Sequence, residues 1–519
     1  MHIPGLPLDY QALPGAMPAV LARVNHDEWN EAARSVHESG GKLVALWGAD
    51  NRERDGAFCV SAAYATAEGL ALLALPITQD AAGGNPLYPD LSGVFHCAAR
   101  MQRALFDLLG LQADAADDQR PWLRHGAWPE GVYPLRKDFD AQQHFDNAQE
   151  VYPFVRVEGE GVHEIPVGPI HAGIIEPGHF RFSIVGEKVL RLEERLGYAH
   201  KGIDKRFETF TVAQGYRLAG RVSGDATVAY AWAYAQAAES LLCITPPARA
   251  IWLRALMLER ERIANHLGDL GALGNDAALA FGLSQFMRLK EDWLRWAAEA
   301  FGHRFMMDCI VPGGVVRDLS PERAGKLGRL AYDIEREAHA LRHIYDEHAG
   351  LQDRFITTGR VTPQLAVRLG LVGFAARASG QTHDLRVDHP CTPYDQLEVK
   401  VASQRNGDVA ARVAVRFDEL FESLRLIHLM LHKLPVGEVL IDLPQAQPES
   451  LGVGWVESWR GAVLVALEAG EGGMIRRCHA HDPSWQNWPL LEHAAMDNIV
   501  PDFPLINKSF NLSYSGHDS

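Results

Sequence analysis

The chain has 519 residues, of which 47% are hydrophobic and 22% are charged. These are ordinary values for globular domains, and they exclude a disordered or collagen-like chain. Its 66 acidic and 50 basic side chains give a net charge of −16, which disfavours nucleic acid as a partner because a broad phosphate-binding surface needs positive charge. At roughly 150 residues per domain, this length predicts two to four domains.

Membrane insertion is not expected, because no apolar run reaches the roughly 18 residues that a spanning helix needs. The longest such run covers only residues 69–77. The N-terminus has neither the basic segment nor the apolar core of a signal peptide. We therefore expect a cytoplasmic chain that reaches a membrane only through partners.

The six cysteines stand far apart, at positions 59, 97, 243, 309, 391 and 478, and the sequence has no Cys-x-x-Cys pair. Iron–sulfur clusters and structural zinc sites usually take at least one closely spaced pair of thiolates. We expect the cysteines to be small buried residues, and the chain to hold no tightly bound cofactor and no metal of its own.

Residues 1–140 are predicted to form a small α+β domain. Its strands are expected at residues 42–47, 57–64 and 69–77, and a helix at residues 96–109. Gly110 is a suitable residue to end this helix, because glycine adopts the left-handed conformation at no steric cost. The polar composition of residues 141–160 predicts a linker.

Residues 161–519 are predicted to form a larger, mainly helical-bundle domain. A β-hairpin is expected at its start, because apolar and polar residues alternate over residues 180–184 and the chain returns over residues 189–196. Long helices are expected at residues 246–270, 320–350 and 408–435. In the last, apolar residues recur at alternating steps of 4 and 3, the pattern of a bundle seam: Val413, Phe417, Leu420, Leu424, Ile427, Leu431 and Leu434. With short strands near the C-terminus, the fold class is α+β.

One helix face carries four ionisable side chains, because they recur at steps of three or four residues: Glu259, Arg262, His266 and Asp269. A solvated face is the simpler interpretation. The alternative is a polar interior of the bundle, in which the pKa values of these groups would be shifted.

Several segments of the chain form recognisable motifs, among them Gly-Pro-Ile-His at residues 168–171. These segments are residues 162–180, 195–203, 258–269, 312–315, 376–380 and 498–510. Together they resemble the large subunit of group 4, energy-converting NiFe hydrogenases and its complex I homologue. Residues 106–110 and 134–138 are similar to the small complex I subunit that is often fused ahead of this one. The resemblance covers nearly the whole chain.

The four nickel ligands of the hydrogenases are missing. Those enzymes hold nickel with two Cys-x-x-Cys pairs, since the site requires soft thiolates. The matching positions here carry Ser223 and Ala226 in one segment and Ser513 and Gly516 in the other. A serine hydroxyl is a hard donor and cannot replace a bridging thiolate. Hydrogenase activity is therefore the least favoured function.

In complex I, which lost the same thiolates, the vacated cavity is a quinone pocket. Its histidine loop matches His171 or His179, and its aspartate after the long helix matches Asp276. His179 and Asp276 are therefore the predicted proton donors, and a nearby carboxylate is expected to hold the histidine charged. The predicted cofactor-contacting residues are His171, His200, Ser223 and Asp225. The tyrosine that binds the quinone in complex I falls at Gly224, so Ser223 or Tyr230 is the candidate replacement and quinone stays an open possibility.

The resemblance implies the large subunit of a membrane-associated, complex I-like complex, related to NADH-quinone oxidoreductases and formate hydrogenlyases. Its redox cavity would lie beside a [4Fe–4S] cluster of a small partner subunit. Antiporter-like membrane subunits would couple electron transfer to ion translocation, with this chain on the cytoplasmic face of the inner membrane. The alternative is a structural coupling scaffold without redox chemistry.

Overall fold

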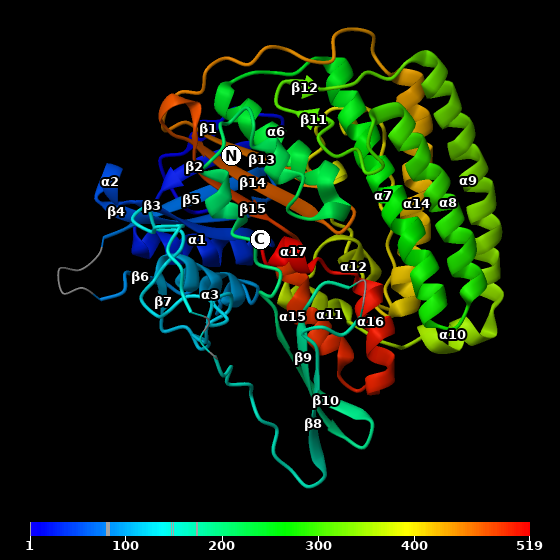
Figure 1. Cartoon of the computed structure of the whole chain (residues 1–519), viewed down its shortest axis with the longest axis horizontal. Helices are drawn as coiled ribbons and strands as arrows, with labels where there is room; N and C mark the ends of the chain where they lie inside the picture. Colours follow the sequence, from blue (N-terminus) through cyan, green and yellow to red (C-terminus); the bar gives the residue numbers. More distant parts are fainter. Residues whose placement is uncertain (1, 79–83, 147, 149, 173–174) are drawn as a thin grey trace.

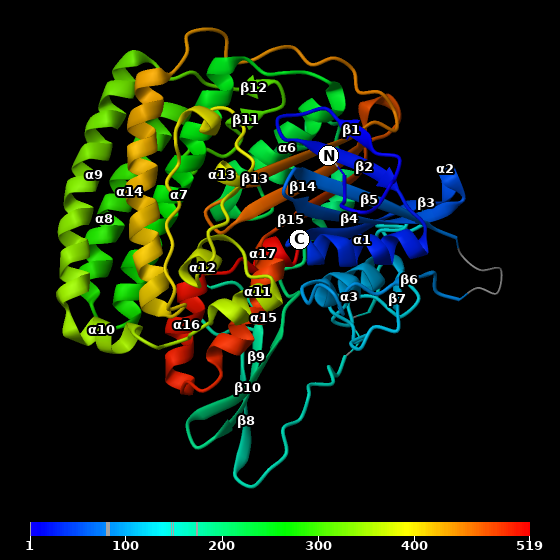
Figure 2. The ribbon, with the colours of Figure 1, turned by 180° about the vertical axis from the view of Figure 1, so that it is seen from behind.

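The computed structural model describes residues 2–78, 84–146, 148, 150–172 and 175–519. Figures 1 and 2 show strands gathered on one side of the molecule and long helices on the other, with the sheet of β8, β9 and β10 projecting away from both. The C-terminus lies between the two sides. Within the described ranges, no helix has the length and apolar character needed to cross a membrane.

A five-stranded sheet of order β1-β2-β5-β4-β3 forms most of the N-terminal part. Its strands are β1 (Gln11–Leu13), β2 (Ala19–Arg23), β3 (Lys42–Asn51), β4 (Ala57–Thr66) and β5 (Gly69–Ile77). One face packs on α1 (His26–Glu38) and α3 (Ala98–Leu109), and the other on strands from the far end of the chain. Because both faces are covered, β5 is apolar along its whole length. The three predicted strands and the helix of this part are confirmed.

The predicted hairpin is confirmed as β9 (His179–Val185) and β10 (Lys188–Arg195). A third strand, β8 (Val162–Val167), pairs with β9 and was not predicted. A second three-stranded sheet near the C-terminus consists of β13 (Leu451–Glu457), β14 (Ala462–Ala469) and β15 (Ile475–His481). It contacts the N-terminal sheet through Trp455 and Leu464.

The long helices are α7 (Ala248–Asp276), α8 (Ala280–Phe301), α9 (Pro321–Glu347) and α14 (Val409–Lys433), which pack side by side as a bundle. Three of them were predicted and α8 was not. Asp408 caps α14 by accepting the amide of Ala411 at 2.9 Å. The predicted seam is buried from Val413 to Ile427 and partly exposed at Leu431 and Leu434.

Helix α6 (Thr227–Leu242) is buried between the bundle and the β13–β14–β15 sheet. It approaches β13 closely because Gly452 and Gly454 have no side chain. A Cβ on either glycine would lie within 2.0 Å of a carbonyl oxygen of α6. This contact places the N-terminus of α6, and the residues just before it, next to the C-terminal sheet.

The remaining elements are short. They are α2 (Arg52–Asp55), β6 (Leu87–Pro89), β7 (Gln112–Asp114), α4 (Ile203–Phe207), α5 (Tyr216–Ala219), η1 (Gly224–Ala226), β11 (Ile310–Val311), β12 (Gly314–Val315), α10 (Ala349–Phe355), α11 (Pro363–Leu369), α12 (Gly373–Ala378), α13 (Leu385–Asp388), η2 (Tyr394–Gln396), η3 (Glu471–Gly473), α15 (Ser484–Ala495), η4 (Val500–Asp502), α16 (Phe503–Phe510) and α17 (Tyr514–His517).

The hydrophobic core is not divided where the predicted linker begins. A single cluster of buried side chains contains Trp29 and Leu105 from the N-terminal part together with Phe180, Trp488 and Phe510. The described residues of the predicted linker have no regular secondary structure and lead to β8. The cysteines at 97, 309 and 478 are buried as expected, whereas Cys243 is exposed, because it ends α6 in a left-handed conformation next to a surface turn.

Candidate functional site

The two segments that lack the expected thiolates meet inside the protein. Ser223, which precedes η1, lies with its Oγ 2.8 Å from the Oγ of Ser513, which caps α17. Both side chains are buried. The Ser513 hydroxyl also accepts the amide of Gly516 at 2.9 Å. Folding therefore brings together positions that are 290 residues apart in the sequence.

Charged side chains complete this group. The Ser223 hydroxyl donates to Asp225 Oδ1 at 2.9 Å, so the Ser513 hydroxyl donates to Ser223. Arg460 binds both carboxylate oxygens of Asp225, at 2.7 and 2.5 Å. Burial acts to raise the pKa of Asp225, but Arg460 and the Ser223 hydrogen bond outweigh it, and the pKa is lowered. We call Ser223, Asp225, Arg460 and Ser513 the serine centre.

The remaining two ligand positions provide no donor atom. Ala226 is a buried methyl group, and a Cβ on Gly516 would lie 2.4 Å from the Oδ2 of Asp482. That carboxylate accepts the Tyr230 hydroxyl at 2.8 Å, and burial raises the pKa of Tyr230 well above its ordinary value. Tyr230 is thus bonded inside the core. Two hydroxyls, a methyl group and a glycine do not fit nickel, which needs soft thiolates at these four positions.

The ionisable stripe on α7 is part of the interior, so the interpretation as a solvated face is wrong. Glu259, Arg262 and His266 are fully buried and Asp269 is 3% exposed. Charged groups from other elements neutralise them. Arg386 of α13 lies 3.1 Å from Glu259, and Glu419 of α14 lies 3.0 Å from His266 Nε2. Spacing along one helix could not reveal these partners, because they come from distant parts of the chain.

Through Asp269 this stripe reaches Asn511, which lies two residues before Ser513 of the serine centre. Its carboxylate accepts the Asn511 side-chain amide at 2.7 Å and Arg416 Nε at 3.0 Å. Asp276, the predicted proton donor, is the exposed last residue of α7 and has no hydrogen bond or ion pair to the described residues. It lies about 10 Å further along the helix, at 1.5 Å per residue. Asp269 therefore contacts the C-terminal segment directly, whereas Asp276 meets it only through the charge of Lys508, which acts to lower the pKa of Asp276.

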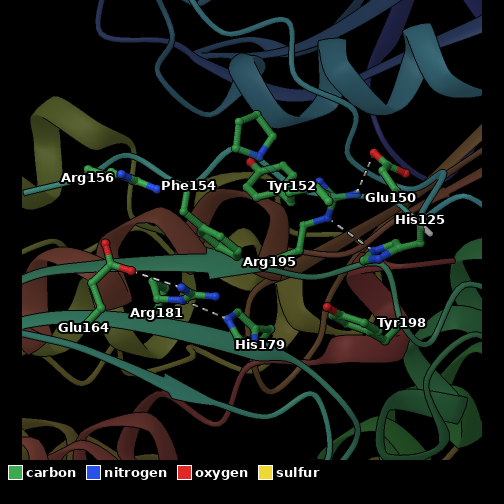
Figure 3. A pocket seen from close by; sticks show the side chains of 12 residues that line it. His125, Glu150, Tyr152, Phe154, Arg156, Glu164, His179, Arg181, Arg195 and Tyr198 are labelled. Atoms are coloured by element: carbon green, nitrogen blue, oxygen red, sulfur yellow. Dashed lines mark hydrogen bonds and ion pairs between the residues drawn. The ribbon is translucent and has the colours of Figure 1, made fainter.

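His179 lines a cleft of about 670 Å³ on the projecting sheet. Figure 3 shows the side chains that surround it. Its Nδ1 lies 3.2 Å from the carbonyl of Gly168, and Arg181 Nε lies 3.4 Å from its Nε2. Burial lowers the pKa of His179; the Gly168 carbonyl opposes this shift and the positive charge of Arg181 adds to it. The expectation of a carboxylate that holds this histidine charged is wrong, because Glu164 pairs with Arg181 at 3.1 Å instead.

Aromatic rings from residues 150–156 face His179 across this cleft (Figure 3). The Phe154 ring lies 5.2 Å from the His179 ring and 4.6 Å from the guanidinium of Arg181. Arg195 lies 4.0 Å from the Tyr152 ring. We call this site the histidine cleft. Sequence reasoning missed its aromatic wall because residues 150–156 were interpreted as linker, although a Tyr-Pro-Phe run in a polar segment was a usable signal.

The other two predicted histidines contact the last residues of the chain. His171 lies 6.2 Å from the Tyr514 ring, burial lowers its pKa, and its buried Nε2 has no partner among the described residues. His200 Nδ1 lies 2.7 Å from the carbonyl of Asp518. The C-terminal segment thus joins the serine centre to the loop that carries His171.

Comparisons with known proteins identify the family. The family model of the respiratory-chain NADH dehydrogenase 49-kDa subunit matches residues 277–451, and that of the 30-kDa subunit matches residues 22–145. Formate hydrogenlyase subunit 5 of Escherichia coli is 30% identical over 99% of this chain and 91% of its own length. The chain belongs to this complex I subunit family.

Further relatives match large parts of the chain. Hydrogenase-4 component G of Escherichia coli is 29% identical over 93% of this chain and 84% of its own. NADH-quinone oxidoreductase subunit 4 of Thermus thermophilus is 28% identical over 73% of this chain and 98% of its own length. A chain of the archaeal membrane-bound sulfane sulfur reductase shares the fold, with a TM-score of 0.65 at 22% identity over 69% of this chain and 99% of that chain. This chain is a fused large subunit of a complex I-like oxidoreductase complex, as the resemblance implied.

Proposed function

We propose that this chain is the large subunit of a membrane-attached, complex I-like complex that transfers electrons without a nickel centre. The hydrogen bond between Ser223 and Ser513 carries this proposal, because it joins two positions that would both need thiolates to hold nickel. Electrons come from a [4Fe–4S] cluster in a small partner subunit. Antiporter-like membrane subunits use the redox step to move ions, with this chain on the cytoplasmic face of the inner membrane.

The small partner docks on the surface beside the serine centre. Gly224 is exposed there, and no atom of a neighbouring described residue lies within 4 Å of where its Cβ would be. Phe305 is a large aromatic side chain that remains 39% exposed, and it lines the same hollow as Asp225 of the serine centre. Exposed aromatic side chains of this kind are typical of protein interfaces. A cluster bound against this surface would lie next to Ser223.

The electron acceptor is a quinone that binds in the histidine cleft. Tyr152 and Phe154 supply a flat apolar surface, and Arg181 and Arg195 supply positive charge. Reduction of a quinone to a quinol consumes two electrons and two protons. The electrons arrive from the partner's cluster, and negative charge on the acceptor raises the proton affinity of His179. His179 then takes a proton from solvent at Nε2, passes it to the reduced acceptor, and repeats this for the second proton.

A structural scaffold is the second candidate, and the closed serine centre favours it. Every polar side chain of the centre is bonded within the protein, and Gly516 leaves no space beside Asp482. In this role the subunit only transmits force between its partners. The two functions differ in whether the complex reduces an added quinone.

The test uses the assembled complex, purified through this chain, with reduced methyl viologen as electron donor and decylubiquinone as acceptor. We expect quinone reduction and far less than one nickel per chain by elemental analysis. His179→Ala should lower turnover at least about 10-fold, the low end of a proton-transfer contribution. The exposed His163→Ala on β8 is the matched control, and co-purification of the partners reports assembly.

Asp276→Asn tests the proton donor predicted from the sequence, with Asp269→Asn beside it. A 10-fold loss in Asp276→Asn would support that prediction, and full turnover would transfer the role to Asp269. Full turnover in His179→Ala complexes would remove this residue from the mechanism. A complex that assembles but reduces no quinone would establish the scaffold, and about one nickel per chain with hydrogen-dependent viologen reduction would overturn both functions.

A further inference from the structure

A second cavity, of about 370 Å³, lies between the N-terminal sheet and the large domain, apart from the serine centre and the histidine cleft. Its N-terminal wall is formed by the start of β3 and the end of β4, and its other walls by α13 and β13. We call it the interdomain cavity. Its size falls in the range of about 300–1,000 Å³ that is typical of small-molecule sites.

Hydrogen bonds across the domain boundary hold this cavity open. His389 Nε2 lies 3.0 Å from the carbonyl of Thr66, and the Gln486 side-chain amide donates to the carbonyl of Val44 at 2.6 Å. The rings of His389 and Trp455 lie 5.7 Å apart, at an interplanar angle of 35°. Because these bonds tie the two walls of the cavity together, a ligand would enter a site that is already formed.

Two hydrogen-bond donors of the cavity have no partner in the described part of the chain. The Lys42 ammonium makes no hydrogen bond and no ion pair with the described residues. The indole N–H of Trp455 likewise has no partner among them, although this side chain is only 6% exposed. An unpaired buried N–H such as that of Trp455 is costly. Lys42 is half-buried, and both residues line the cavity, where an acceptor could reach them.

The acidic residues of the cavity do not supply this acceptor, because each is bonded elsewhere. Glu457 accepts Arg377 Nη1 at 3.0 Å and the amide of Leu385 at 3.1 Å. Asp388 Oδ2 lies 3.2 Å from His383 Nδ1. The third carboxylate, Asp384, accepts Arg386 at 2.7 Å.

The negative charge of Asp388 and Glu457 acts to raise the pKa of Lys42, but it does not offset the lowering that burial causes. Burial lowers the pKa of Lys42 to about 8, while Asp388 and Glu457 act to raise it. An anionic group placed beside Lys42 would offset the effect of burial on its ammonium. It would also favour the charged form of the lysine at neutral pH.

We propose that the interdomain cavity binds a small organic carboxylate with a flat, apolar body. The carboxylate accepts hydrogen bonds from the Lys42 ammonium and the Trp455 indole. The body lies against the His389 ring and the side chains of Leu43 and Ala65, which line the same cavity. Nothing in this proposal depends on the redox chemistry proposed above.

The test is calorimetric titration of the purified full chain with 2-naphthoate and with 2-naphthylmethanol, which has the same rings but no charge. We expect saturable binding of 2-naphthoate at least 10-fold tighter than that of the alcohol. Lys42→Met should remove this difference, and Trp455→Phe, which lacks the indole N–H, should weaken 2-naphthoate binding several-fold. Lys400→Met removes the same charge at an exposed position and should change neither affinity.

A second measurement needs no variant. Limiting acetic anhydride at pH 8 should acetylate Lys42 more slowly when 2-naphthoate is present, while acetylation of Lys400 stays unchanged; peptide mass spectrometry reads both. Equal affinity for the two naphthalenes, unchanged binding in Lys42→Met, or unchanged acetylation of Lys42 would overturn the proposal.

Discussion

Single residues determine what the serine centre can hold. Gly516 is the clearest case, since a Cβ there would meet the carboxylate that binds Tyr230. The loss of a thiolate at this position is therefore more than the loss of a donor atom. The surrounding carboxylate and hydroxyls have closed around a glycine, so no single cysteine substitution would restore the former ligand.

Gly516→Ala tests this closure. The added methyl group must displace Asp482 Oδ2 or the Ser513 hydroxyl, at 2.4 and 2.9 Å. We expect the free energy of unfolding to fall by about 1–3 kcal/mol, the usual cost of an overpacked core. Gly224→Ala is the matched control and should be neutral, because within the described part of the chain no neighbouring atom lies within 4 Å of its Cβ position. Urea denaturation measures the free energy of unfolding of both variants. Equal values for Gly516→Ala and Gly224→Ala would contradict a closed centre.

At the scale of elements, α7 carries buried charge through the bundle. Glu259 contacts Arg262, Arg386, Tyr394 and Ser423, and Arg386 and Arg262 together lower its pKa although burial acts to raise it. The helix can bury this face only because α13 and α14 supply the opposite charges. Removal of one partner would leave the others unpaired in a medium of low dielectric constant.

Glu259→Leu should therefore lower the free energy of unfolding by about 3–5 kcal/mol, the cost of breaking a buried ion pair. Glu299→Leu, on the exposed surface of α8, should change it by no more than about 0.5 kcal/mol. Glu259→Leu combined with Arg386→Met should cost less than the sum of the two single changes, because the second removes the unpaired cation. Additive losses in the denaturation curves would show that the pair is not coupled.

At the scale of the whole molecule, the N-terminal and C-terminal parts share one core and one sheet edge. β3 is an edge strand, and its carbonyls at Gly48 and Val44 accept side-chain donors from Arg477 and Gln486. Such capping protects the edge from pairing with another chain. It also couples the stability of the first 140 residues to that of the last 50.

We therefore expect the full chain to unfold as one unit, although its two parts match separate family models. Hydrogen exchange measured by mass spectrometry at increasing urea should give the same midpoint for peptides from β4 and from α14. Coincident transitions are the usual criterion for two-state unfolding. Loss of protection in β4 at clearly lower urea would show that the shared core does not couple the two parts.

Much of the architecture was predictable from the sequence, because it depends on local patterns. The apolar run at residues 69–77 predicts β5, and the apolar seam predicts α14 to within two residues at each end. The resemblance of whole segments led to the positions of the missing thiolates. That inference needs no geometry, since it compares residue types at matched positions.

The protonation and surroundings of the site were decided by the tertiary structure. Periodicity shows which side chains share a face of α7, but burial of that face depends on Arg386, 127 residues from Glu259, and on Glu419, 153 residues from His266. The state of His179 depends likewise on Gly168 and Arg181, which only the folded sheet places against its ring nitrogens. A pKa reflects the dielectric and the charges around a group in space. Spacing along the chain therefore identified candidate groups, and packing determined which of them are charged and where they can act.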